Sequence, residues 1–144
     1  MKDTIDYSEI PTNYIVCLNR ECSKADSCLR QLVAEIIPSE VKQINIINPK
    51  YLTTFKSDCP YYKVAEKMRY AKGFIKMLEN MTYKQMQNVT PSLKAHFGRM
   101  MYFRMRKGDR LISPAEQQDL LVIVERYGIS QPQDFDEYIE KYEW

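Results

Sequence analysis

Four cysteines are the residues of this chain best suited to chemistry, and all of them lie within the first 59 positions. Thiolates are strong ligands of zinc and the usual ligands of iron–sulfur clusters. Gaps of four, five and thirty residues separate them, whereas common structural zinc sites use C-x2–4-C pairs. The clustering therefore predicts a metal site without naming the ion. Its predicted ligands are Cys17, Cys22, Cys28 and Cys59.

Zinc is the leading expectation for this site, and an iron–sulfur cluster is the alternative. The dipeptide Cys59-Pro60 resembles the Cys-Pro ending of some ferredoxin motifs. A third possibility is that the cysteines bind no metal and pack as small apolar residues. Four thiolates leave no open coordination position for water, so we expect a structural metal rather than a catalytic one.

Disulfides are the least expected fate of the four thiols. Residues 1–20 contain three acids and a proline where the apolar segment of a signal peptide would lie. No apolar run approaches the ~20 residues of a membrane span. We therefore expect a cytoplasmic protein with no membrane partner, in which the thiols stay reduced.

Catalysis finds little support in the sequence. His96 is the only histidine, and it lies in a predicted helix far from the cysteines and beside basic residues. None of the common nucleotide-binding, zinc-protease or serine-hydrolase motifs is present. With only four glycines, a phosphate-binding loop is not expected either. The sequence therefore predicts a binding protein rather than an enzyme.

A basic segment from residue 94 to residue 110 is the second candidate site. It carries six Lys and Arg residues against one acid, Asp109. Two short predicted helices, 91–97 and 99–107, meet at Gly98, as a helix-turn-helix requires. The predicted nucleic-acid contacts are Lys94, Arg99, Tyr102, Arg104, Arg106, Lys107 and Arg110. The alternative is an amphipathic helix with a solvated basic face that pairs with the acidic C-terminal segment.

The charge distribution allows both interpretations of this segment. Residues 1–60 carry a net charge of −1, residues 61–110 a net charge of +9, and residues 111–144 a net charge of −6. Either the acidic C-terminal segment folds against the basic middle, or the middle binds a polyanion such as DNA.

The predicted elements begin with a helix from Ser27 to Pro38, capped by Asp26 or Ser27, because Leu29, Val33 and Ile36 share one helical face. Cys28 would lie in its first turn, where the helix dipole favours a thiolate. Residues 41–48 alternate like a strand that ends at Asn48-Pro49. Residues 67–73 predict a short strand, and residues 74–80 predict a helix.

Helix signals dominate the rest of the chain. A capping box at Thr82 and Gln85 opens one short helix, and Thr90-Pro91 opens a second that ends at Gly98. Further helices are predicted over 99–107, 114–127 and 134–142. Gly108 is expected to stop the first of these, and a capping box at Ser113 and Glu116 to open the second. The expected fold is α+β and mostly α, with a cysteine-rich module at 1–80 that includes a small β element. A helical region at 81–144 packs on it, and the two could form one continuous unit.

Several motifs together resemble a family of uncharacterised small proteins from anaerobic gut bacteria. They are YIVCLNRECSKADSCLR, INPKYL, DCPYY and HFGRMMYFRMRKGDRLISPAEQ, followed by YGI and FDEYIEKYEW. The resemblance implies that the four cysteines recur in the family, and it implies no activity. The second half is similar to short helix-turn-helix-like regulators at Phe97-Gly98, Phe103-Arg104, Gly108 and Ser113-Pro114.

The function expected from these features is that of a metal-stabilised binding protein, specifically a nucleic-acid-associated regulator. One alternative is an iron–sulfur or thiol-based redox sensor. The other is a protein–protein adaptor that uses its tyrosine- and methionine-rich surface. The chain has eleven tyrosines and eight methionines.

Overall fold

The computed structural model describes residues 4–55, 58–129 and 134–144. The chain forms two compact units, the first made of residues 1–66 and 142–144 and the second of residues 67–141. The boundary therefore lies before the predicted one at residue 80, because residues 67–80 belong with the helices that follow them. The mostly helical α+β fold is confirmed, with two small sheets of two strands each among the described residues.

The first unit contains short elements joined by turns. Strands β1 and β2 pair in parallel, with Ile15 opposite Asn45 and Val16 opposite Ile46. Two 3₁₀ turns, η1 and η2, precede the main helix of the unit. The elements are η1 (Tyr7–Glu9), β1 (Ile15–Val16), η2 (Ala25–Ser27), α1 (Leu29–Ile36), β2 (Asn45–Ile46) and α2 (Pro49–Leu52).

Helix α1 confirms the predicted helix after residue 27, although its N-cap differs. Leu29 and Val33 are buried one turn apart, as the apolar spacing requires. The N-cap is Cys28 rather than Asp26 or Ser27, and it makes no side-chain capping bond. Instead, the backbone N–H of Leu29 donates to the carbonyl of Lys63 at 2.7 Å. A distant segment thus satisfies one of the unpaired donors of the helix N-terminus.

The strand predicted over 41–48 is much shorter in the structure, and Asn48-Pro49 has a second role. Only Asn45 and Ile46 pair as β2. The side chain of Asn48 accepts a hydrogen bond from the backbone N–H of Lys50, and Pro49 occupies the first turn of α2. The dipeptide that ends the strand therefore also starts a four-residue helix.

The apolar core of the first unit is small. Among the described residues its fully buried cluster has four members, Val16, Leu29, Val33 and Tyr142. Trp144 packs against this cluster and meets the ring of Tyr14 edge to face at 5.4 Å. Residues 142–144 therefore complete a core whose other buried members come from β1 and α1.

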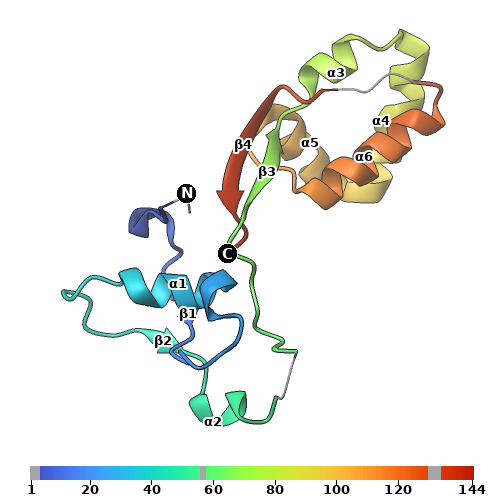
Figure 1. The fold of residues 1–144 in the computed structure, drawn as a ribbon. Helices are drawn as coiled ribbons and strands as arrows, with labels where there is room; N and C mark the ends of the chain where they lie inside the picture. The colour runs from blue at the N-terminus through green and yellow to red at the C-terminus, as the bar shows by residue number, and fades with distance from the viewer. Residues whose placement is uncertain (1–3, 56–57, 130–133) are drawn as a thin grey trace. The chain divides into compact units, whose positions relative to one another are not determined.

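The second unit contains a strand pair and four helices. Figure 1 shows β3 and β4 side by side and running in opposite directions, next to the packed helices α4, α5 and α6. The elements are β3 (Lys67–Lys72), α3 (Ile75–Glu79), α4 (Tyr83–Phe97), α5 (Arg99–Lys107), α6 (Pro114–Arg126) and β4 (Glu137–Tyr142).

The helix predicted over 134–142 is wrong, because residues 137–142 form strand β4. The apolar residues there do follow a helical spacing, but the segment is rich in tyrosine and isoleucine, which favour strands. Strand β3 supplies a pairing partner that the local sequence does not reveal. Across the pair, the guanidinium of Arg69 lies over the ring of Tyr138 at 3.7 Å.

The two short helices predicted on either side of Thr90 form the single helix α4, with Pro91 inside it. Proline within a helix removes one backbone hydrogen bond and costs about 3 kcal/mol. Val89 and Leu93, one turn apart around Pro91, are both fully buried. Their burial offsets that cost, so the helix continues through the proline.

Other helix boundaries confirm the sequence signals. Both predicted capping boxes are present, Thr82 with Gln85 at the start of α4 and Ser113 with Glu116 at the start of α6. Gly108 ends α5 in the left-handed conformation. The buried cluster of this unit has fourteen members among the described residues, far more than that of the first unit.

A close approach at Gly73 joins β3 to α3. Its φ of +78° suits glycine, and a Cβ there would lie 2.7 Å from Oδ2 of Asp136. The Asp136 carboxylate accepts hydrogen bonds from the backbone N–H groups of Ile75 and Lys76, both at 2.9 Å. The segment before β4 therefore caps α3.

Replacing Tyr142 with alanine tests the contribution of the C-terminal residues to the first unit. Because Tyr142 is 3% exposed, we expect Tyr142→Ala to lower the free energy of unfolding of this unit by roughly 3 kcal/mol. Fluorescence of Trp144, the only tryptophan, can report the urea transition. Ile139→Ala is the control, since Ile139 is 38% exposed on the same strand. Equal effects of the two substitutions would contradict this role.

Candidate functional site

All four cysteines border one cavity in the first unit. The cavity has a volume of about 310 Å³, and Cys17, Cys22, Cys28 and Cys59 all line it. Cys17 and Cys28 are buried, whereas Cys22 and Cys59 are partly exposed. The structure therefore brings together the four residues that the sequence predicts as metal ligands, although 30 residues separate the last two along the chain.

Regular elements position the two buried cysteines. Cys17 directly follows β1, and its backbone N–H donates to the carbonyl of Arg30 at 3.2 Å. Cys28 is the N-cap of α1 and forms an isolated antiparallel bridge with Val64. The strand and the helix thus fix one side of the cavity.

Tight turns position the two partly exposed cysteines. The N–H of Cys22 donates to the carbonyl of Asn19 at 3.3 Å, which closes a four-residue turn. The carbonyl of Cys59 accepts from the N–H of Tyr62 at 3.1 Å, so Pro60 is the second residue of the next turn. Proline is favoured at that position because its fixed φ suits the turn. The geometry of this turn therefore explains why a proline follows Cys59.

Gln31 is a residue of this site that the sequence analysis missed. It is the one buried polar residue among those described, at 5% exposed. Its side-chain Nε2 donates to Sγ of Cys17 at 3.4 Å and to the carbonyl of Asn19. A glutamine three positions after Cys28, on the buried face of α1, is the signal that could have revealed it.

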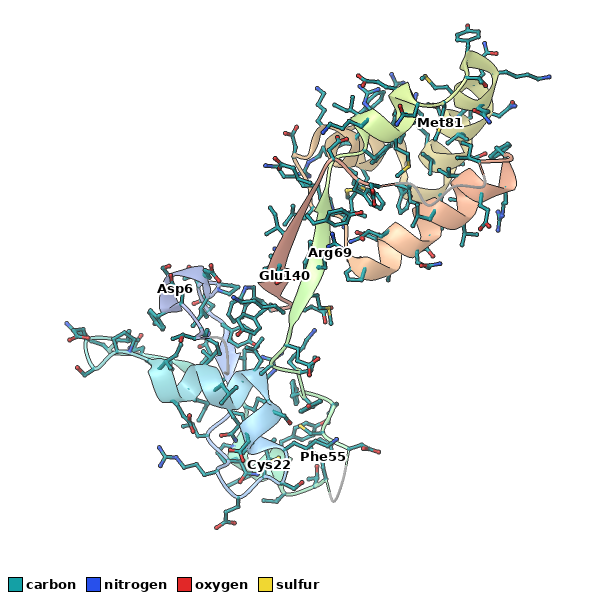
Figure 2. All side chains as sticks on the ribbon, turned by 45° about the horizontal axis from the view of Figure 1, so that its top comes forward. Asp6, Cys22, Phe55, Arg69, Met81 and Glu140 are labelled. Atoms are coloured by element: carbon teal, nitrogen blue, oxygen red, sulfur yellow. The ribbon has the colours of Figure 1, made fainter. Side chains whose placement is uncertain are left out.

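Aromatic and charged side chains complete the cavity wall. Figure 2 shows Cys22 and Phe55 near one another, and both line the cavity. Lys24 and Arg30 also line it, and Glu21 is the one acid among the described residues of the wall. The guanidinium of Arg30 donates to the carbonyls of Tyr61 and Ile15 at 2.9 and 2.6 Å. Arg30 thus links the segment of Tyr61 to β1 through hydrogen bonds.

The four cysteines are free thiols and are not gathered around a single point. No disulfide joins them. Within the described part of the chain, no three Cys, His, Asp or Glu side chains are placed to hold one metal ion. The cysteines are therefore neighbours around a shared space rather than a preformed tetrahedron.

Five of the predicted nucleic-acid contacts lie on α4 and α5 of the second unit and are together called the basic cluster: Lys94, Arg99, Arg104, Arg106 and Lys107. Three of them surround the partly buried ring of Phe103, with their charged groups 4.9, 5.9 and 5.1 Å from its centroid; these are Lys94, Arg99 and Arg106. Arg104 and Lys107 are exposed on the same helix. Phe103 is the organising residue that the sequence analysis did not assign to the site.

The other two predicted contacts have structural surroundings. Tyr102 is 1% exposed and packs edge to face against Phe74, so it is a core residue, although the charged groups of Lys94 and Arg106 lie 5.5 and 5.8 Å from its ring centroid. Nη2 of Arg110 donates to Oε1 of Glu116 at 2.9 Å. Arg110 thus supports the capping box of α6.

The connection between α4 and α5 differs from the predicted helix-turn-helix. Gly98 alone separates the helices and caps both, with φ of +87°. A helix-turn-helix joins its helices by a turn of three or four residues. The helix before the junction also has 15 residues rather than the short length predicted.

His96, the only histidine, lies on an exposed groove between α4 and α6. Its Nε2 is 3.4 Å from Oδ2 of Asp119, and its ring meets Phe97 edge to face. Both partners of the ion pair are about half exposed. The pair links two helices at the surface.

These features define a small two-unit α+β protein with a cysteine-lined cavity and a separate basic cluster. The family of unknown function DUF6078 matches residues 1–144, and the chain belongs to this family. No curated protein and no solved structure matches the chain. Membership of an uncharacterised family confirms the coarser part of the expected resemblance. In the described parts of the chain, no helix is long and apolar enough to cross a membrane.

The Arg110–Glu116 contact makes stability depend on pH. Burial alone would raise the pKa of Glu116, but the hydrogen bonds from Arg110 and Ser113 outweigh it and lower that pKa below its usual 4.5. A lowered folded pKa means that the carboxylate stabilises the fold above about pH 4.5 and loses this contribution as the pH falls through the folded pKa.

We therefore expect Glu116→Gln to flatten the loss of unfolding free energy between about pH 5 and pH 3. Urea unfolding at a series of pH values measures this slope. Glu125→Gln, which changes an exposed acid on the same helix, should leave the slope as it is in the unaltered chain. A Glu116→Gln slope equal to that of the unaltered chain would show that the contact does not have this role.

Proposed function

We propose that this chain is a metal-stabilised binding protein of the cytoplasm. Its first unit holds zinc or an iron–sulfur cluster through Cys17, Cys22, Cys28 and Cys59, and its second unit contacts nucleic acid through the basic cluster. The observation that carries the metal proposal is the convergence of all four cysteines on one cavity.

The small core of the first unit supports a structural metal. A unit of fewer than about 70–80 residues gains only a few kcal/mol from its core and usually needs disulfides or a metal. Here four residues form the buried cluster of the described chain in this unit, and the cysteines form no disulfide. Metal binding linked to folding contributes about 10–16 kcal/mol in zinc-finger peptides, so it would compensate for the small core.

The charges around the cavity also favour bound thiolates. Four thiolates around a dication carry a net negative charge, which is costly to bury without nearby positive groups. Lys24 and Arg30 line the cavity against one acid, Glu21, among the described residues of its wall. The amide of Gln31 donates to the Cys17 sulfur, as residues just outside a metal centre commonly do for its ligands.

Metal content and stability of cysteine variants test this proposal. In protein purified without chelator or oxygen, we expect stoichiometric zinc or iron that Cys22→Ser and Cys59→Ser each reduce at least tenfold. A chelator should shift the Trp144 fluorescence of the unaltered protein to that of the unfolded first unit. The reason is that the binding free energy is part of the folding free energy.

Ser23→Ala is the matched control for these variants. Ser23 lines the same cavity beside Cys22 but offers no thiol. Its metal content should equal that of the unaltered protein. Absence of both zinc and iron from the unaltered protein would overturn the metal proposal.

A specific observation supports nucleic-acid contact, namely three cations held around one aromatic ring. Cation–π contacts with Phe103 hold the charged groups of Lys94, Arg99 and Arg106 near one ring before any ligand binds. A guanidinium that lies over a ring still has N–H groups at its edge. Two of these can bind one phosphate at the same time. Preordering lowers the entropy cost of the contact.

The ion pairs of the second unit leave this cluster available. In the described chain, Lys63, Lys72 and Arg110 of the basic middle each pair with a glutamate of the acidic segment. None of these three cations belongs to the basic cluster. Arg99 opens α5, at the end of the helix dipole that disfavours cations, so helix stability does not explain it.

Binding to a DNA duplex at several salt concentrations tests this second part. If all five cations contact phosphates, affinity should fall roughly 500-fold between 50 and 200 mM salt. The double variant Arg99→Ala, Arg104→Ala should weaken binding at 50 mM salt. It should also reduce the slope of log affinity against log salt by about 2.

The control removes the same charge elsewhere in the second unit. Lys84→Ala with Arg126→Ala changes two exposed cations on α4 and α6 that lie outside the basic cluster. This pair should keep the affinity and slope of the unaltered protein. No binding at 50 mM salt, or an equal loss in the control, would overturn the nucleic-acid proposal.

A further inference from the structure

We infer that the cysteine cavity takes a polynuclear iron–sulfur cluster of the four-iron, four-sulfide type rather than a single zinc ion. This inference rests on the proposed four-cysteine metal centre and names the group bound there. It is carried by the separation of the cysteines around the cavity, together with the size and chemistry of its wall.

The separation of the thiols argues against a single ion. Zinc–sulfur bonds of about 2.3 Å in a tetrahedron place the four sulfurs about 3.8 Å apart, with no space left between them. The described side chains contain no set of three ligands placed in this way, yet all four cysteines face one cavity. A cluster core of eight atoms lies between its four thiolates and holds them farther apart.

The cavity is large enough for such a core. Its volume is about 310 Å³. A single zinc ion, by contrast, occupies only the centre of its sulfur tetrahedron and needs no cavity of this size. Cys17 and Cys28 are buried where β1 ends and α1 begins, so these two ligands border the cavity from fixed positions.

The wall of the cavity also suits a cluster. Ile47, Leu52 and Phe55 provide an apolar lining, which limits water access and helps to set the reduction potential. The Gln31 amide donates to the Cys17 sulfur at 3.4 Å, and hydrogen bonds to the sulfurs are a second determinant of that potential.

Stoichiometry and spectroscopy of the unaltered full chain test the inference directly. We expect protein purified without oxygen to carry about four irons and about four acid-labile sulfides per chain, with a broad absorbance near ~400 nm. Cys59→Ser should lose most of this absorbance, and Ser23→Ala should keep it. The colour and sulfide content of the unaltered chain are readouts that do not depend on how well a variant folds.

The outcomes separate the cluster from the broader metal centre. One zinc per chain, colourless and without sulfide, would overturn the cluster and leave the four-thiolate metal centre standing. Iron without labile sulfide would do the same. Neither zinc nor iron would overturn both. To distinguish acquired from preferred metal, apo protein can be offered either zinc or equal amounts of ferrous and ferric iron with sulfide. The cluster should form from the mixed iron without a further oxidant and should resist displacement by equimolar zinc.

Discussion

The shortage of apolar surface in the first unit is the constraint on which most of its structure depends. Its buried cluster joins residues of β1 and α1 to Tyr142, and Trp144 covers the cluster from the edge. Hydrogen bonds from distant segments supply much of the remaining order, as at the N-terminus of α1 and around Arg30. Because such a core contributes only a few kcal/mol, the cysteine-lined cavity stands where further stabilisation would matter most.

Local features of the fold could be predicted, and features that depend on distant partners could not. The capping boxes at Thr82 and Ser113 and the glycine after α5 were read correctly, because each is decided within a few residues. Helix α4 continues through Pro91 because Val89 and Leu93 are buried against the rest of the unit. Strand β4 forms because β3 pairs with it, and nothing within residues 134–142 indicates that partner.

The candidate site divides in the same way. The cysteine set could be identified because thiols are rare and were clustered, and one cavity collects all four. Gln31 could not, because a glutamine in a helix is ordinary until its burial and its contact with the Cys17 sulfur are known. Tyr102 and Phe103 are adjacent and both lie near cations, yet Tyr102 is buried in the core and Phe103 is only partly buried. That distinction depends on how α5 is rotated against its neighbours.

The placement of residues 142–144 in the first unit has a consequence for the order of folding during synthesis. The cysteines and α1 leave the ribosome early, but the aromatic residues that complete their core follow only after the whole second unit has been made. At about 5–20 residues per second, this interval lasts several seconds. The second unit also needs late residues, namely Phe135 in its core and the strand β4. Both units are therefore completed only when the residues that follow position 134 have been made, and the first unit waits for them much longer.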